Sequence, residues 1–214
     1  MNFNKHYELK DKHSFLSASK YHWINYDEAT LFERYSHSYD NTIGTLVHEL
    51  AASLIQNKIK LNKGDHKIVL LHLLNNGIPR DVIDMERIYS NLANYVNDSI
   101  GFRMVPEQIL KYSDLAFATT DAINSLEEIF KTKRLRIHDL KTGSTPAHIE
   151  QLKVYAAYFC LEYNVKPSDL DIELRIYQND DIIGYIPEVD EIFPIMDKIV
   201  TFNKIMTSIA YEEV

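Results

Sequence analysis

The sequence predicts an α/β fold of the α+β kind, in which helices flank a central mixed sheet of about four or five strands. Apolar residues recur at helical spacing over residues 43 to 59, and the spacing changes toward two after Gly101. The length of 214 residues suits a single domain. We expect a mostly helical lobe over about 1–100, a sheet core over about 101–190 and a final helix over 190–214.

Composition restricts the classes of protein. A net charge of −8 argues against a protein that coats nucleic acid through bulk electrostatics, but acidic metal ligands contribute to such a sum, so a nuclease remains open. The single Cys160 excludes an internal disulfide and a four-cysteine metal site within one chain. Neither a membrane-length apolar run nor a signal-peptide core is visible, so we expect a cytoplasmic protein without membrane contact.

The helix expected from Ile43 to about Ile59 carries a histidine at the edge of its apolar stripe. Gly44 and Ala52 lie one turn to either side of His48 and leave room beside the imidazole. Glu49 points nearly opposite, toward solvent. A histidine in this position is more often an ordinary core residue, and metal ligation is the alternative. The helices expected over 66–76 and 79–98 carry no chemical signal.

Two strands are expected over 102–112 and 115–123, joined by a turn at Ser113-Asp114. The second strand places Asp121 on one face with Leu115, Phe117, Thr119 and Ile123. An acid on an apolar face is costly unless something pairs with it, so Asp121 is a candidate metal ligand. Glu107 is a weaker candidate, because strand edges often carry glutamate for solubility.

A polar connection over 124–133 leads to a short strand that contains Asp139 and Lys141. Alternation places both side chains on the face of Leu135 and Ile137. A carboxylate there can hold a hard divalent cation, and the lysine can orient or deprotonate a water. The alternative is a surface ion pair of little energetic value.

A helix is expected from Pro146 through Tyr163. Gln151 and Tyr155, four residues apart, belong to a polar and aromatic face that begins soon after Lys141. This face is either an ordinary solvated surface or a neighbour of the proposed ion. Strands over 172–178 and 182–186 and a helix over 190–210 complete the prediction.

Four motifs in this order resemble those of the PD-(D/E)XK nuclease superfamily, and among its branches the RecB-like exonucleases. The resemblance covers roughly residues 43 to 178 and implies a restriction-endonuclease-like core. The matching segments are Gly44-Thr45-Leu46-Val47-His48-Glu49, Thr119-Thr120-Asp121-Ala122-Ile123, Ile137-His138-Asp139-Leu140-Lys141-Thr142-Gly143 and Gln151-Leu152-Lys153-Val154-Tyr155.

The resemblance assigns a role to each matching residue. It implies that His48, Asp121 and Asp139 ligate Mg²⁺ or Mn²⁺, together with the backbone carbonyl of Leu140. Asp121, Asp139 and Lys141 would be catalytic, with Lys141 positioning the attacking water. Gln151 and Tyr155 would orient the substrate strand or the ligands. Several relatives hold an iron–sulfur cluster with four cysteines, and we expect no such cluster here.

The expected function is a metal-dependent DNA nuclease, an exonuclease acting at DNA ends, single strands included, in phage or bacterial recombination and repair. The alternative is a catalytically silent binding or scaffold module that acts on a protein partner or on DNA ends. A recombination partner protein and a homo-oligomer both remain open. Lys20 is a candidate phosphate contact, although a helix start that packs Trp23 is the more ordinary use of its segment. The candidates for a local basic track are Lys20, Lys131, Lys133, Arg134, Arg136 and Lys153.

Overall fold

The computed structural model describes residues 24–143 and 145–212, and Lys20 lies outside these ranges. The chain divides into two compact units, Met1–Thr42 and Ile43–Val214. In the first unit, α1 (Glu28–His37) begins where the Asp27 carboxylate accepts the N–H of Thr30 at 2.8 Å, an N-terminal cap. Helix α2 (Asp40–Gln56) starts in this unit and continues into the second.

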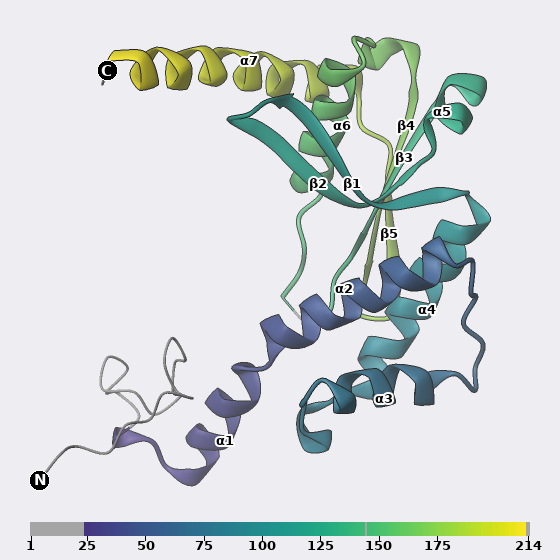
Figure 1. The fold of residues 1–214 in the computed structure, drawn as a ribbon, viewed down its shortest axis with the longest axis vertical. Coiled ribbons are helices and arrows are strands. Elements are labelled where there is room, and N and C mark those ends of the chain that lie inside the picture. The colour runs from purple at the N-terminus through teal and green to yellow at the C-terminus, as the bar shows by residue number, and fades with distance from the viewer. Residues whose placement is uncertain (1–23, 144, 213–214) are drawn as a thin grey trace, which may run out of the picture. The chain divides into compact units, whose positions relative to one another are not determined.

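The second unit is an α+β arrangement with a five-stranded mixed sheet, as the sequence predicts (Figure 1). Its strands are β1 (Met104–Ser113), β2 (Ala116–Asn124), β3 (Arg134–Leu140), β4 (Asp171–Gln178) and β5 (Asp181–Tyr185). Its further helices are α3 (His66–Asn75), α4 (Met85–Gly101), α5 (Leu126–Thr132), α6 (Glu150–Glu162) and α7 (Val189–Glu212), with 3₁₀ turns at Arg80–Val82 and Pro167–Asp169.

Several predicted element boundaries are wrong. The helix predicted from Ile43 to about Ile59 begins at Asp40 and ends at Gln56. The helix predicted over 79–98 begins at Met85, because Asp84 caps it by accepting the N–H of Arg87. The helix predicted from Pro146 begins at Glu150. The polar connection predicted over 124–133 contains α5, which the Ser125 hydroxyl caps and whose Ile129 is fully buried. A seven-residue helix with one buried side chain leaves little periodicity in the sequence.

The strands follow one another across the sheet in the order β1-β2-β3-β4-β5. β3 and β4 are parallel and the other neighbours are antiparallel, so the predicted meander of the first three strands is confirmed. The parallel pair requires a crossover, and α6 supplies it. Helix α4 lies on one face of the sheet, and α6 with α7 lies on the other (Figure 1).

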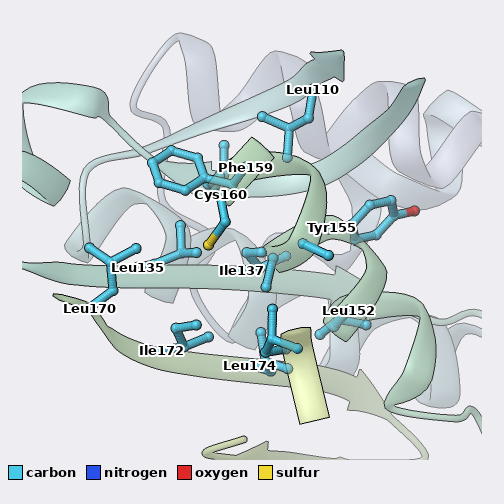
Figure 2. Close-up of a cluster of buried hydrophobic side chains, with 14 of the residues drawn as sticks. Leu110, Leu135, Ile137, Leu152, Tyr155, Phe159, Cys160, Leu170, Ile172 and Leu174 are labelled. Carbon is cyan, nitrogen blue, oxygen red and sulfur yellow. The ribbon is translucent and has the colours of Figure 1, made fainter. Parts of the chain in front are cut away.

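The main core lies between the sheet and α6. Figure 2 shows side chains of β3 and β4 such as Leu135, Ile137 and Leu174 facing Leu152 and Phe159 of α6. These side chains are almost completely buried. Their burial fixes the position of α6 relative to the end of β3, where the polar residues of interest follow. In the described ranges no helix is long and apolar enough to cross a membrane.

The face predicted for β2 is only partly correct. Ile123 is buried against the core, but Leu115 and Phe117 are 53% and 56% exposed, and Ala118 packs toward the core instead. The change of face occurs opposite Glu107 of β1, whose backbone is left-handed with φ 53°. A residue in this conformation interrupts the simple alternation of a strand. The periodicity of the sequence could not show where that interruption lies.

Candidate functional site

The site begins where the ladder between β2 and β3 ends. Only two residue pairs join these strands, Ala122 with His138 and Ile123 with Ile137. Beyond these pairs the Asp121 side chain joins the two strands, because its Oδ2 accepts the backbone N–H of Leu140 at 2.9 Å. This bond holds the Asp121 carboxylate against the end of β3.

At the other end of the ladder a side chain of β2 again bonds to the backbone of β3. Asn124 donates to the carbonyl of Arg134 at 2.9 Å and accepts the N–H of Arg136 at 2.8 Å. The role of Asn124 was not predicted from the sequence. A polar residue directly after an apolar strand end is the only signal that could have suggested this role.

His48 approaches Asp121 from α2. Its Nδ1 lies 3.5 Å from Oδ2 of Asp121, and its side chain is 28% exposed, as expected for the edge of the apolar stripe. Gly44, one turn earlier, makes room for this approach, since a Cβ there would lie 3.3 Å from Oγ1 of Thr142. Burial lowers the pKa of His48 below its usual value, so the imidazole is neutral and has a free electron pair. Glu49 is exposed, as predicted.

Asp139 and Lys141 share one face of the β3 segment, as the alternation predicts. Asp139 is fully buried, and Nζ of Lys141 donates to its Oδ1 at 3.1 Å. Its Oδ2 lies 2.9 Å from the same Nζ but accepts no hydrogen bond of normal geometry. One buried carboxylate oxygen therefore retains capacity for another ligand.

Helix α6 completes the site. Nζ of Lys141 also donates to Oε1 of Gln151 at 3.0 Å, and Nε2 of Gln151 donates to the Tyr155 hydroxyl at 2.6 Å. Tyr155 anchors this chain, because its ring belongs to the core while its hydroxyl points away from the apolar cluster (Figure 2). The predicted polar and aromatic face of α6 therefore contacts the site and is not an ordinary solvated surface.

Two carboxylates with one lysine make the site electrostatically unbalanced. Burial raises the pKa of Asp121, against the lowering effect of the Leu140 N–H. Burial also raises the pKa of Asp139, and the neighbouring Asp121 raises it further. Both groups resist ionisation because they are poorly hydrated, and the negative charge of Asp121 adds to this effect at Asp139. Additional positive charge at this place would favour the ionised form of both acids.

The donor set suits a divalent cation. Carboxylate oxygens and a neutral imidazole are the ligands that Mg²⁺ and Mn²⁺ accept, with the nitrogen more favourable to Mn²⁺. The buried Oδ2 of Asp139 has an ion-pair contact with Lys141 but accepts no hydrogen bond of normal geometry. Over residues 24–143 and 145–212, no three His, Cys, Asp or Glu side chains are arranged to hold a metal ion as they stand. Ligation by His48, Asp121 and Asp139 would therefore require shifts of these side chains.

Comparison with family models, with curated proteins and with solved structures finds no match to this chain. These comparisons therefore assign the chain to no family.

Glu107 is near the site but less firmly part of it. The register of β1 and β2 places it opposite Asp121, since Pro106 pairs with Ala122 and Gln108 with Thr120. Its charge adds to the raised pKa of Asp121 and partly opposes the lowering of the pKa of His48 by burial. Its side chain is exposed, so a functional role remains a prediction.

Three residues of the proposed basic track are already paired with acids. Nη2 of Arg134 lies 3.5 Å from Oδ2 of Asp171. Arg136 donates to Glu173 at 2.9 Å on the α4 side of the sheet, and Lys153 donates to Glu191 at 2.6 Å. Their guanidinium and ammonium groups are therefore poorly suited to bind phosphate. Lys131 and Lys133, which come just before β3, are the exposed candidates that remain among the described residues.

A polar network lies behind β3, and sequence analysis missed it. Tyr177 donates to Asp98 at 2.8 Å and contacts Nδ1 of the buried His138 at 3.2 Å. Burial, with Arg175 and Arg136 nearby, lowers the pKa of His138 to about 3, so this histidine is neutral. The backbone carbonyl of Tyr177 also accepts the N–H of Lys141 at 3.0 Å. The network thus supports the strand that carries Asp139 and Lys141.

Proposed function

We propose that this chain is a divalent-metal-dependent DNA nuclease, of the PD-(D/E)XK type with a restriction-endonuclease-like core, and that it acts as an exonuclease. The observation that carries the proposal is the convergence of the motif residues. Side chains from α2, β2, the end of β3 and α6 meet in one cluster of polar contacts. These elements are separated in the sequence, so their meeting is a property of the fold and not of the motif spacing.

His48, Asp121 and Asp139 would hold the cation, together with the Leu140 carbonyl. When bound, the cation would supply Lewis-acid polarisation of the phosphodiester and a lower pKa for its water. The neutral imidazole and Oδ2 of Asp139, which accepts no hydrogen bond of normal geometry, are the groups that make this ligand set chemically suitable.

Lys141 has a separate part in the reaction. Its ammonium is oriented by Asp139 on one side and by the Gln151 carbonyl on the other. Held in this way, Nζ can orient the attacking water and carry a proton at a fixed position. The Tyr155 hydroxyl accepts from Nε2 of Gln151 and so fixes which end of the amide faces the lysine.

The exonuclease part of the proposal follows from charge. A chain with a net charge of −8 cannot bind DNA over its whole surface, so a narrow local contact suits a strand end better than a duplex interior. Lys133 directly precedes β3 and is separated from Asp139 by about 20 Å of extended chain, at about 3.3 Å per residue, while Lys131 lies in the last turn of α5. They could hold the sugar-phosphate backbone at a distance from the reacting bond.

The net charge is also the observation that favours the second candidate, a silent scaffold with the same fold that binds a protein partner or DNA ends. End-labelled linear DNA and covalently closed circular DNA, each incubated with Mg²⁺ or Mn²⁺, distinguish the candidates. We expect degradation of the linear DNA only, and none by Asp139→Asn.

Each other outcome of this assay has a defined meaning. Rapid cutting of circles would contradict the exonuclease part and leave the nuclease part standing. No cutting of any DNA or RNA substrate with either ion would favour the scaffold.

A further inference from the structure

The outer edge of β5 is the last edge of the sheet on that side. The turn that leads into it consists of Asn179 and Asp180, whose φ angles are 53° and 61°. Two left-handed residues define a type I′ hairpin turn, in which the flanking pair, Gln178 and Asp181, is hydrogen bonded. Hydrogen-bonded and non-bonded pairs then alternate along the hairpin. The backbone groups of Ile182 and Gly184 must therefore point outward, away from β4.

This edge is only partly protected. Oδ1 of Asp181 accepts the outward N–H of Ile182 at 2.8 Å, which confirms that β4 does not use this donor. In the described part of the chain, no strand pairs with the outer side of β5. Neither lysine nor proline interrupts residues 181–186, although these residues commonly prevent edge pairing in natural sheets.

The side chains of this segment are unusually apolar for an exposed strand. Ile182, Ile183 and Ile186 are 39%, 44% and 77% exposed. Beside them on the sheet surface is an open groove of about 580 Å³. Its lining consists of Glu173, Arg175, Ile182, Gly184, Tyr185 and Ile186.

Gly184 lies in the middle of β5, and no contact within the chain requires a glycine at this position. Its φ is not in the left-handed region, and a Cβ built there would have no atom within 4 Å. Glycine inside a strand costs about 0.5–1 kcal/mol relative to alanine. Such a glycine often marks the close approach of another backbone.

We propose that a second copy of this chain pairs with the β5 edge, antiparallel about a two-fold axis at Gly184. The outward backbone groups fix this register. Gly184 exchanges hydrogen bonds with Gly184 of the second copy, and Ile182 lies opposite Ile186. Because Gly184 has no side chain, space remains at the axis, and the paired isoleucines on either side can pack into it and cover the groove. On the other face Ile183 lies opposite Tyr185.

The register places Asp181 opposite Pro187, but it also brings Asp180 toward Glu188 of the second copy, so acids meet at both ends of the paired segment. Pro187 does not disturb the pairing, because its nitrogen is at a position that points away from the second copy. The total charge of −8 per copy opposes association, so the dimer should become tighter as salt screens the repulsion.

Sedimentation analysis of the full chain from about 1 to 100 µM tests the pairing. We expect a reversible monomer–dimer equilibrium that shifts toward dimer with added salt. Gly184→Pro removes an N–H that only the second copy would use, and proline is tolerated at such edge positions. We expect it to be monomeric with unchanged circular dichroism, whereas Phe202→Lys, which removes a comparably exposed apolar side chain on α7, should still dimerise.

A double variant provides an independent test in case the proline variant misfolds. Ile182→Lys with Ile186→Lys places lysines on the edge without changing the backbone and should also give monomers. A wild-type chain that stays monomeric throughout the range would overturn the proposal. A dimer that persists in both folded edge variants would overturn it equally, because another surface would then be responsible.

Cross-linking tests the register itself. Cα atoms of a hydrogen-bonded antiparallel pair are about 5.5 Å apart, within the range of a disulfide. Gly184→Cys should therefore form a covalent dimer rapidly on mild oxidation. Ile183→Cys is the matched control, since it faces Tyr185 and should cross-link more slowly. The native Cys160 is buried and should not interfere. Equal rates for the two variants would contradict the two-fold at Gly184.

Discussion

The Asp121 carboxylate accepts the backbone N–H of Leu140 at 2.9 Å, where the ladder between β2 and β3 stops. One side chain thus has two tasks. It holds the end of β3 in position, and it presents a partly buried carboxylate to the site. Substitutions at this position can separate the two tasks, because an amide preserves the hydrogen bond and removes the charge.

Asp121→Asn should fold normally and lose activity. The amide oxygen still accepts the Leu140 N–H, and the cost of burying a charge disappears, so the free energy of unfolding should not fall. Asp121→Ala leaves that N–H unpaired and should lose about 1–3 kcal/mol. Nuclease turnover should fall at least about 10²-fold in both, and likewise in Asp139→Ala. Urea unfolding and a DNA digestion assay measure the two effects. A folded Asp121→Asn with near-normal turnover would contradict the assignment.

His48→Ala should weaken Mn²⁺ binding by about 10-fold or more, because it removes the nitrogen ligand next to Asp121. Calorimetric titration of the purified variant measures the affinity. Glu49→Ala is the control, since it removes an exposed side chain from the adjacent position of α2 and should leave the affinity unchanged. Equal affinities in wild type and His48→Ala would make His48 an ordinary partly buried residue.

Tyr155→Phe should lower turnover by about 10-fold or more while the protein stays folded. The ring keeps its place in the core, but Gln151 loses the acceptor that orients its amide toward Lys141. Tyr158→Phe removes a hydroxyl from the same helix and should have little effect. Steady-state rates on linear DNA, with melting temperatures of both variants, provide the comparison. A rate loss in Tyr158→Phe of the same size would indicate a general effect on α6.

Glu191 should make the stability of the chain depend on pH below about 5. Hydrogen bonds from Lys153, Tyr185 and the Glu188 N–H lower its pKa from 4.5 to about 2. A carboxyl with a lowered folded-state pKa stabilises the fold above its unfolded value, and this contribution is lost as the pH falls toward 2. The urea midpoint of wild type should exceed that of Glu191→Gln at pH 6, and the difference should shrink toward pH 2. Asp190→Asn controls for the loss of one negative charge.

The sequence by itself determined the kinds and order of the elements and the shared face of Asp139 and Lys141. Both follow from local backbone geometry, since helical and strand periodicities decide where neighbouring side chains point. The same reasoning placed His48 at the edge of its helix stripe. It failed for α5, whose cap and single buried side chain leave little periodic signal, and for the outer half of β2, where the left-handed Glu107 lies opposite the change of face.

Only the tertiary structure decided which of these side chains meet. Lys141 reaches Gln151 because the core between β3 and α6 fixes the helix beside the strand end, and His48 reaches Asp121 because Gly44 lets α2 lie close to Thr142. The pairing of Arg136 with Glu173 and of Lys153 with Glu191 likewise depends on contacts between residues 37 and 38 positions apart. Contacts over such separations depend on the packing of the whole sheet, which no local pattern encodes.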